Sequence, residues 1–223
     1  MPVNRVAVIG GTGAEGSGLA ARWAKAGIEV VIGSRDAARA RQAVEELTAG
    51  VPEARATGAE NGAAAAAADV VVVTVPFAGQ AATYKSIAPH VRQGAVVVDC
   101  TAPLAAAVGG KAGHMLGVWQ GSAAQQAAAL LEHGAPCAAF HSLSAATLQR
   151  LDTQLDGDVL VCGPTAAKPA VAELVEAIPG LRYVDAGPLD NARLIESLTA
   201  LLIGINRRYK VRGAGIRITG LPT

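Results

Sequence analysis

A phosphate-binding loop is indicated by three glycines near the N-terminus with G-x-G-x-x-G spacing, Gly11, Gly13 and Gly16. They follow the apolar run 6–9 and open a stretch of helix-forming residues, 14–26, and the next apolar run is 29–32. Glycines here permit a tight turn, close approach of the backbone to a pyrophosphate, and close packing of helix on strand. The N–H groups and dipole at the start of the helix attract the anion. This strand–loop–helix–strand order predicts a dinucleotide site.

The residues between the glycines belong to the same predicted site. Thr12 adds a hydroxyl to the loop, and Ala14 and Glu15 form the start of the helix. The alternative is a glycine-rich turn that binds nothing, and the surrounding order of elements disfavours it.

The end of the second strand decides which dinucleotide fits. An NAD site usually has Asp or Glu about 20 residues after the glycines, where it binds the ribose 2′-hydroxyl. Here the strand ends in Ser34 and Arg35, and Arg39 follows one helical turn later. A hydroxyl and guanidinium groups suit a 2′-phosphate, so the sequence predicts NADP(H). Asp36 can instead bind a 2′-hydroxyl, and the arginines can be solvated surface residues; both alternatives stay open.

Two further strand ends are expected at the same edge of the sheet. The valine-rich run 70–75 ends at Val75 and is followed by Pro76 and Phe77. The strand 136–140 ends at His141. Ligands of open α/β sheets bind outside the carboxyl ends of the strands, so these residues are expected to border the crevice. The alternation of strands and helices predicts an α/β fold with a Rossmann-type, doubly wound parallel sheet.

The long helix expected from about residue 192 carries further polar candidates. Arg193, Glu196, Ser197 and Ala200 share one face by helical spacing, and Thr199 lies beside them. Arg193 and Glu196 can equally form a solvated ion pair, and the hydroxyls can bond their own helix. No nucleophile–base constellation stands out in the sequence, which fits hydride transfer by a cofactor.

The composition limits which classes of protein and which cellular compartments remain possible. The chain of 223 residues is 51% hydrophobic with net charge +1, which gives no electrostatic case for nucleic acid or a membrane surface. No apolar stretch has the length of a transmembrane helix, and the first strand starts too early for a signal peptide. Three scattered cysteines form no metal pattern and are expected to be buried thiols in a reducing compartment. We therefore expect a cytoplasmic protein without a bound metal.

With these residues assembled, the chain resembles the NADPH-dependent F420 reductases, the 8-hydroxy-5-deazaflavin:NADP oxidoreductases. The resemblance runs nearly end to end and is carried by residues 6–35, the TVPF at 74–77 and the segment 185–203. It implies reversible hydride transfer between NADP(H) and coenzyme F420 in a homodimer. It also implies an NADP-binding Rossmann domain, 1–143, and a smaller C-terminal α/β domain, 144–223, that completes the deazaflavin site and the dimer interface.

The resemblance also assigns residues to the two ligands. Thr12, Ser34, Arg35 and Arg39 match positions that hold NADP, and Val75, Pro76 and Phe77 match the nicotinamide side. The positions placed around the deazaflavin, in positioning roles, are His141, Arg193, Ser197 and Thr199. The loops 104–121 and 141–147 depart from the family pattern, so another acceptor, such as a flavin, ferric chelate or imine, and a non-catalytic NADP(H) sensor remain alternatives.

Overall fold

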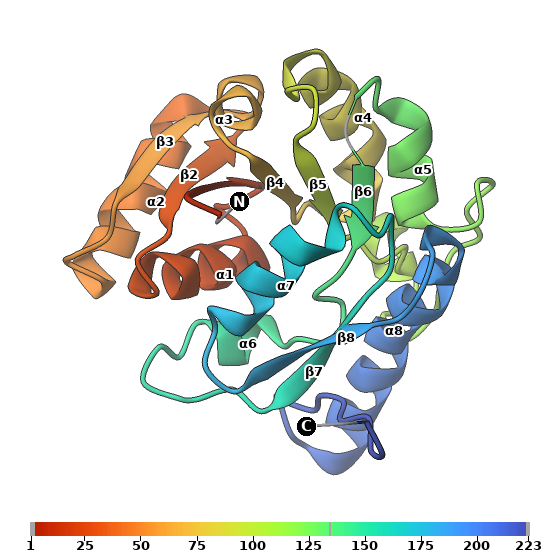
Figure 1. Cartoon of the computed structure of the whole chain (residues 1–223). Helices are drawn as coiled ribbons and strands as arrows, with labels where there is room; N and C mark the ends of the chain where they lie inside the picture. The colour runs from red at the N-terminus through yellow and green to blue at the C-terminus, as the bar shows by residue number, and fades with distance from the viewer. Residues whose placement is uncertain (1–2, 134, 222–223) are drawn as a thin grey trace.

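Short apolar strands form a parallel sheet at the centre of the molecule. The computed structural model describes residues 3–133 and 135–221. The sheet has six strands in the order β3-β2-β1-β4-β5-β6 (Figure 1). Their bounds are β1 Arg5–Ile9, β2 Glu29–Ser34, β3 Ala56–Glu60, β4 Val70–Val73, β5 Val96–Asp99 and β6 Ala135–Ala138. From β1 the chain first builds the sheet outward through β2 and β3, and then crosses to the other side of β1 to add β4, β5 and β6. The point between β1 and β4 is therefore the topological switch point, where doubly wound sheets bind ligands. The predicted fold class is confirmed.

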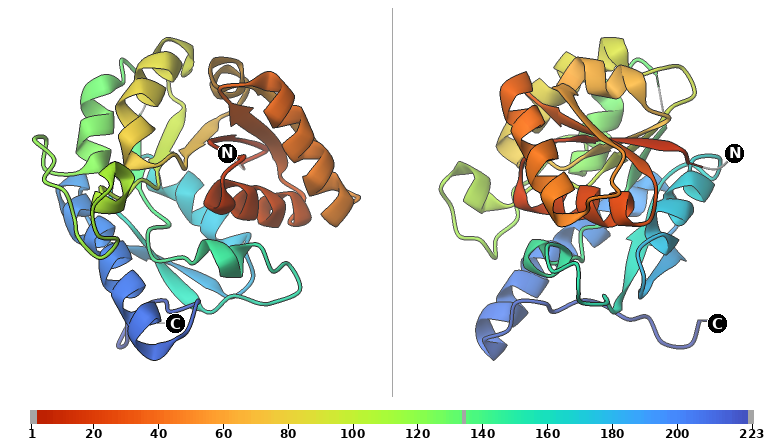
Figure 2. Two further views of the ribbon diagram at one scale, coloured as in Figure 1. Left: turned by 180° about the vertical axis from the view of Figure 1, so that it is seen from behind. Right: turned by 90° about the vertical axis from the view of Figure 1, so that its left-hand side faces the viewer.

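Helices cover both faces of this sheet (Figure 2). Alternate residues of β1 point to opposite faces: Val6 and Val8 pack in one apolar cluster, and Ala7 and Ile9 pack in another. The first cluster includes residues of α1 (Ala14–Lys25), α2 (Ala37–Gly50) and α7 (Lys168–Glu176). The second includes residues of α3 (Asn61–Ala67), α4 (Phe77–Ile87) and α5 (Ala123–Leu130). Burial on both faces explains why the strands read as continuous apolar runs.

The C-terminal part adds a smaller two-stranded sheet. Its elements are α6 Ala145–Leu148, β7 Gly157–Val161, β8 Leu181–Asp185 and α8 Ala192–Tyr209. Strands β7 and β8 are parallel, and an antiparallel bridge between Ala138 and Cys162 links β7 to the end of β6. The indole of Trp23 on α1 donates to the carbonyl of Leu174 on α7 at 2.8 Å. One apolar cluster therefore spans both parts, and a division near residue 143 stays a prediction.

Several boundaries differ from those expected. Strand β4 ends at Val73 and α4 begins at Phe77, so residues 74–76 connect them without regular secondary structure. Strand β6 ends before residue 139, because Phe140 adopts a left-handed backbone with φ 69°. Helix α6 was not predicted, since it contains a single turn. Short 3₁₀ helices occur at η1 Ala88–His90, η2 Ala105–Val108 and η3 Leu189–Asn191, and η2 lies in the loop 104–121.

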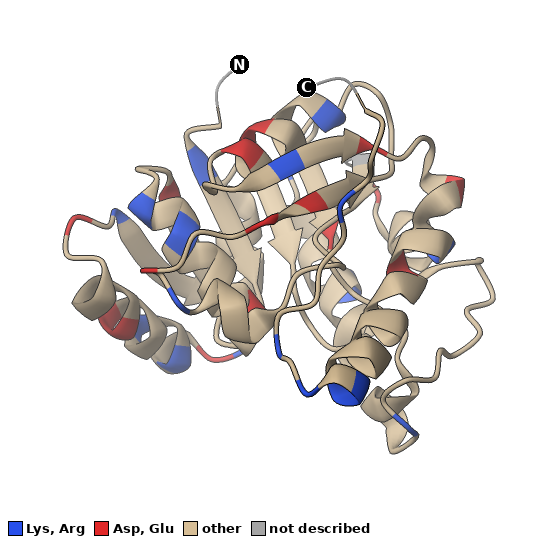
Figure 3. Ribbon diagram, turned by 90° about the horizontal axis from the view of Figure 1, so that it is seen from below, with Lys and Arg blue, Asp and Glu red and all other residues tan. Residues whose placement is uncertain are grey.

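The surface carries charges of both signs. Basic and acidic residues are interspersed on the face shown in Figure 3. Within residues 3–133 and 135–221, no helix is both long and apolar enough to cross a membrane. In the same described residues, no group of three or more His, Cys, Asp or Glu side chains could hold a metal ion.

Candidate dinucleotide and acceptor site

The glycine loop packs directly against the end of β4. Gly10 has φ +82°, and a Cβ on it would lie 2.8 Å from Val75 Cγ1. A Cβ on Gly16 would lie 2.5 Å from Thr74 Oγ1 and 2.7 Å from the Gly10 carbonyl. Side chains at these positions would therefore push the loop and the first turn of α1 away from the strand. Gly10 precedes the three glycines singled out in the sequence, and its left-handed backbone makes it part of the same cradle.

The start of α1 offers backbone donors to an anion. In the loop, Gly13 N–H donates to the Gly10 carbonyl at 2.9 Å, and Ser17 N–H donates to the Gly13 carbonyl at 2.8 Å. Among the described residues, four N–H groups of this turn have no protein partner: those of Thr12, Ala14, Glu15 and Gly16. Thr12, Gly13 and Ala14 are exposed. These donors, together with the helix dipole, fit a pyrophosphate.

The predicted 2′-phosphate site lies where β2 meets α2. Ser34 is buried, and its hydroxyl oxygen accepts from the Asp36 N–H at 3.3 Å. The Asp36 carboxylate caps α2 by accepting from the Ala38 N–H at 2.8 Å. Arg35 and Arg39 are both exposed, and neither forms an ion pair within the described part of the chain. With the acid engaged by the helix and both guanidinium groups accessible, this corner fits a phosphate better than a hydroxyl.

Residues 74–77, which directly follow β4, lie beside the glycine loop, and we call them the shelf. Thr74 Oγ1 donates to the Ile9 carbonyl at 3.1 Å, which ties β4 to β1. After it, Val75 and Phe77 are half-buried and Pro76 is exposed. Because Val75 contacts the loop through Gly10, the shelf continues the surface on which the dinucleotide is expected to lie.

The end of β5 supplies two polar residues that the sequence did not single out. Asp99 is fully buried and accepts from Tyr84 OH at 2.7 Å, and from Gln80 Nε2 and the Thr101 N–H at 2.9 Å each. Burial raises the pKa of Asp99 to about 6, and these hydrogen bonds oppose the rise. Thr101 in turn donates its hydroxyl to the Val75 carbonyl at 3.2 Å. Polar residues directly after an apolar strand were the available signal for both.

His141 lies next to this group. Its Nε2 is 3.2 Å from the Thr101 carbonyl, which can only accept, so Nε2 carries the proton. Burial lowers the pKa of His141 to about 4, so the ring is neutral at pH 7. The other ring nitrogen, Nδ1, is buried without a hydrogen-bond partner among the described residues. The neutral ring therefore presents an unused acceptor.

Acidic side chains also approach the glycine loop. Burial, with a contribution from Asp99, raises the pKa of Glu15 to about 8. The thiol pKa of Cys100 is raised well above its usual value by burial and by both of these acids. All three cysteines are free and buried, as expected.

The residues of α8 separate into two groups. The Thr199 hydroxyl donates to the His141 carbonyl at 2.9 Å, which places it beside the crevice. Glu196 is buried and accepts from the N–H groups of Ala123 and Ala124 at 2.9 and 3.0 Å. It therefore caps α5, and no ion pair with Arg193 is present among the described residues. Burial raises the pKa of Glu196 to about 7, against the effect of these two bonds.

The remaining two candidates of α8 lie on its exposed side. Arg193 is exposed, and Ser197 donates its hydroxyl to the Arg193 carbonyl at 2.6 Å, within its own helix. The structure thus joins His141 and Thr199 directly, and it leaves Arg193 and Ser197 accessible to a ligand or a partner.

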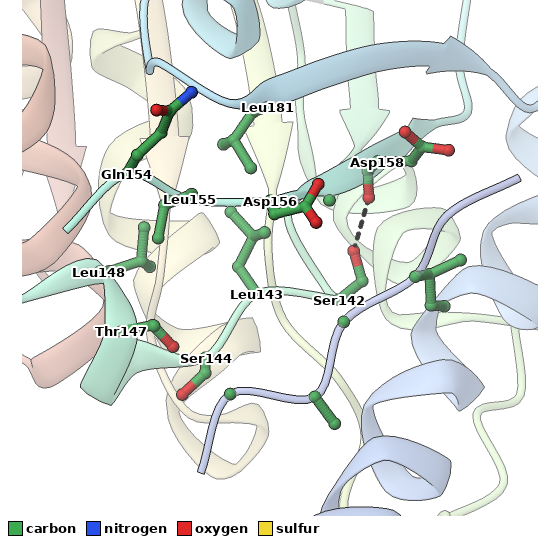
Figure 4. A pocket seen from close by; sticks show the side chains of 15 residues that line it. Ser142, Leu143, Ser144, Thr147, Leu148, Gln154, Leu155, Asp156, Asp158 and Leu181 are labelled. Atoms are coloured by element: carbon green, nitrogen blue, oxygen red, sulfur yellow. Dashed lines mark hydrogen bonds between the residues drawn. The ribbon is translucent and has the colours of Figure 1, made fainter.

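A cavity of about 140 Å³ lies below the His141 segment (Figure 4). It is lined by the hydroxyls of Ser142, Ser144 and Thr147, by the start of β7 and by residues 213–216 of the tail. The Ser142 hydroxyl donates to the Asp158 carbonyl at 3.0 Å. A second cavity, of about 340 Å³, lies between Arg22 and Pro179. Neither cavity includes residues of the glycine loop, so both are separate from the crevice.

Comparisons with known proteins agree with this geometry. The family model described as "NADP oxidoreductase coenzyme F420-dependent" matches residues 5–103. The F420-dependent NADP reductase of Methanothermobacter thermautotrophicus is 47% identical over 99% of this chain and 97% of that protein. The chain belongs to the F420-dependent NADP reductase family. The F420-dependent NADP reductase of Methanocaldococcus jannaschii is 39% identical over 97% of this chain and 99% of that protein.

A solved structure shares the whole fold. A candidate F420-dependent NADP reductase from Arthrobacter sp. FB24 superposes with a TM-score of 0.82 at 22% identity, covering 97% of this chain and 99% of that one. The likeness therefore extends through β7, β8 and α8, beyond the part that the family model matches. The predicted family resemblance is confirmed by the relatives, and the roles of individual site residues stay predictions.

Proposed function

We propose that this protein catalyses reversible transfer of a hydride between NADP(H) and the deazaflavin coenzyme F420. The observation that carries this proposal is an identity of 39–47%, over nearly the whole chain, to proteins named F420-dependent NADP reductase. The bound nicotinamide and deazaflavin supply the hydride chemistry, so the protein needs no side-chain nucleophile. Its own residues bind the two ligands, orient them and exclude water.

The proposed roles follow the geometry of the crevice. The N–H groups at the start of α1 hold the pyrophosphate, and Ser34, Arg35 and Arg39 hold the 2′-phosphate. Val75, Pro76 and Phe77 border the nicotinamide. The residues proposed to position the deazaflavin are His141, Arg193, Ser197 and Thr199. Two observations support this assignment: His141 Nδ1 has no partner among the described residues, and Arg193 and Ser197 are exposed.

A spectrophotometric assay tests the reaction. Purified protein is mixed with NADPH and oxidised F420, and the loss of the visible band of the deazaflavin is followed, with NADH as the control reductant. We expect rapid bleaching with NADPH and slow bleaching with NADH. Tight NADPH binding without bleaching would contradict F420 as the acceptor, and equal rates with both reductants would contradict the choice of NADP(H).

Arg35→Ala tests the phosphate site. Loss of a charge-assisted bond to a phosphate removes about 1.5–3 kcal/mol, so the KM for NADPH should rise about 10- to 100-fold. The KM for NADH should stay the same, because NADH has no 2′-phosphate. The matched control is Arg41→Ala, which removes another exposed arginine of α2 and should change neither value. An equal rise for both reductants in Arg35→Ala would exclude a phosphate contact.

We also propose that the protein is a cytoplasmic homodimer that associates through α8. Three large apolar side chains on this helix are exposed, Leu194, Leu201 and Tyr209, with Leu198 and Ile205 partly buried between them. Their spacing of three and four residues forms a continuous seam along the helix. Light scattering after gel filtration should give the mass of a dimer for the natural chain and of a monomer for Leu201→Glu. A monomeric natural chain would contradict the proposal.

A further inference from the structure

Thr101 lies between the nicotinamide side and the deazaflavin side of the proposed site. Its N–H, hydroxyl and carbonyl groups each form a hydrogen bond. Its N–H donates to Asp99 Oδ1 at 2.9 Å, and its hydroxyl donates to the Val75 carbonyl at 3.2 Å. Its carbonyl accepts from His141 Nε2 at 3.2 Å. The residue is only 3% exposed, so water does not compete for these bonds. One buried side chain and its backbone thus join the shelf at the end of β4 to His141.

We propose that Thr101 is a positioning residue for the hydride transfer: it holds Val75, on the nicotinamide side, and His141, on the deazaflavin side, in a fixed relation. This inference rests on the proposed function, because it takes Val75 and His141 as the borders of the two ligands. Hydride transfer depends on the alignment of donor and acceptor, and small displacements of positioning groups reduce its rate. A residue that connects both borders therefore affects the rate more than the binding of either ligand.

On the nicotinamide side, the Thr101 hydroxyl holds the shelf in place through its hydrogen bond to the Val75 carbonyl. The Val75 carbonyl has no other hydrogen-bond partner among the residues that the structure describes. Val75 also touches the glycine loop, since a Cβ on Gly10 would lie 2.8 Å from its Cγ1. The position of Val75 is thus set by the loop from one side and by the Thr101 hydroxyl from the other.

On the deazaflavin side, Thr101 determines the tautomer of His141. A carbonyl accepts a hydrogen bond and cannot donate one, so the contact requires a proton on Nε2 and leaves Nδ1 as an acceptor. Nδ1 is buried and has no partner within the described residues, which leaves it available to an N–H or O–H group of a ligand. If the Thr101 carbonyl moved, the ring could rotate or exchange its proton, and this acceptor would be lost.

The backbone of His141 is held independently of Thr101. The preceding residue, Phe140, is buried with φ 69°, and its ring packs edge-on against Trp23 at a centroid distance of 5.7 Å. A left-handed backbone at a bulky residue is strained and persists where the surroundings fix it. The Thr199 hydroxyl donates to the His141 carbonyl at 2.9 Å. Changing the Thr101 side chain should therefore disturb the shelf, while the segment that carries His141 keeps its path and the bond from Nε2 to the backbone carbonyl of residue 101 remains.

Thr101→Val tests the proposal, because valine keeps the shape of threonine and removes the hydroxyl donor. We expect kcat for F420 reduction to fall about tenfold, the usual effect of losing one hydrogen bond, while the KM for NADPH changes less than about twofold. Thr101→Ser restores the donor and should recover most of the lost kcat. The matched control is Thr83→Val, which changes an equally buried threonine on α4 and should leave both constants as they were. If Thr101→Val does not fold, Thr101→Cys, which has only a weak donor, takes its place with the same expectations.

A second readout does not depend on turnover. Nitrogen-15 NMR of the ligand-free protein at pH 7 distinguishes the two histidine tautomers, and His141→Gln assigns the signal among the four histidines. We expect His141 to carry its proton on Nε2 in the natural chain and in both the Val and the Ser variants, because all three keep the backbone carbonyl that accepts from Nε2.

Three results would overturn the proposal: a proton on Nδ1 in the natural chain, a normal kcat in Thr101→Val, or equal losses of kcat in the Val and Ser variants. Failure of the proposed function looks different. In that case the natural chain does not reduce F420 at all, and the NMR measurement still reports whether Thr101 holds His141.

Discussion

Two fully buried aspartates flank the segment that carries His141, and their surroundings give them opposite properties. Asp99, at the end of β5, is surrounded by the neutral donors Gln80, Tyr84 and the Thr101 N–H. Asp158, in β7, accepts from two guanidinium groups: Arg182 at 2.7 and 2.9 Å, and Arg217 at 3.1 Å. The Ile218 N–H adds a bond to Asp158 at 2.6 Å. Burial raises the pKa of Asp99 to about 6, whereas the bonds from Arg182 lower the pKa of Asp158 to about 2.

The difference shows that burial alone does not fix the charge of a carboxyl group. Neutral donors only partly replace the water that Asp99 loses, so its charged form remains unfavourable. Guanidinium groups outweigh the effect of burial on the pKa of Asp158, and they connect β7 to β8 and to the C-terminal tail. We infer that the Asp158 cluster is a structural clamp, while the Asp99 cluster lies in the crevice and tolerates a change in protonation.

The two clusters hold the same segment from opposite sides. The Ala139 N–H donates to the Asp99 carbonyl at 3.2 Å, and the Ser142 hydroxyl donates to the Asp158 carbonyl at 3.0 Å (Figure 4). His141 lies between these two attachments. Its position therefore depends on both the Rossmann sheet and the smaller sheet.

Removal of the structural clamp should have the largest effect on stability. Asp158→Ala leaves Arg182 and Arg217 without their buried acceptor, and the loss of one partner of such a pair costs about 3 kcal/mol. Urea unfolding at pH 7 should show a decrease of this size. Asp156→Ala is the matched control: Asp156 also pairs with Arg217 but its side chain is 81% exposed, so less than about 1 kcal/mol should be lost. Equal losses in the two variants would contradict the distinction between clamp and surface pair.

The pH dependence of unfolding should distinguish the two aspartates. Because the folded-state pKa of Asp99 is raised, its contribution to stability is fully present below the unfolded value near 3.8 and is lost as the pH rises through about 6. The folded-state pKa of Asp158 is lowered, so its contribution is present above 3.8 and is lost as the pH falls towards about 2. Between pH 4 and pH 7 the titration of Asp99 should therefore lower the stability, whereas that of His141, whose folded-state pKa is lowered to about 4, acts in the opposite direction.

Asp99→Asn isolates the contribution of the crevice aspartate. Asparagine keeps the shape and cannot ionise, so the variant should gain stability relative to the natural chain between pH 4 and pH 7, by on the order of 2 kcal/mol. Subtracting the two profiles removes the titration of His141, which both proteins share. The charge of Asp99 contributes to the raised pKa of Glu15 and of Glu196, so the difference profile also contains the change in their titrations. Parallel profiles over this range would show that Asp99 does not titrate there.

Loss of one guanidinium from the clamp should have the smallest effect. Arg217→Ala removes a half-exposed partner, while Arg182 keeps both of its bonds to Asp158, so the loss of stability should be much smaller than in Asp158→Ala. The measurement is again urea unfolding at pH 7, with Arg212→Ala as the control on the same tail. A loss of stability as large as that of Asp158→Ala would mean that Arg217, rather than Arg182, is the main partner of Asp158.

Much of the fold could be predicted because its signals are local. The apolar runs of β1, β2, β4 and β5, and the capping residue Ser122 of α5, identify their elements without tertiary contacts. The end of β6 could not be predicted, since the apolar sequence continues through Phe140 while its backbone turns left-handed. The sequence also left open whether Glu196 pairs with Arg193: the N–H groups at the start of α5 provide Glu196 with partners that helical spacing does not reveal.

The sequence by itself determined the glycine loop, the Ser34–Arg35 corner and the alternation of strands and helices, because each depends on residues within one or two turns of chain. Only the tertiary structure decided which buried groups carry charge and which ring nitrogen of His141 is free. The side chains that bond to the Asp99 carboxylate lie 15 and 19 residues away, and the partners of the Asp158 carboxylate lie 24 to 60 residues away. A side chain's pKa and hydrogen bonds depend on the groups around it in space, and folding brings those groups together from distant parts of the chain.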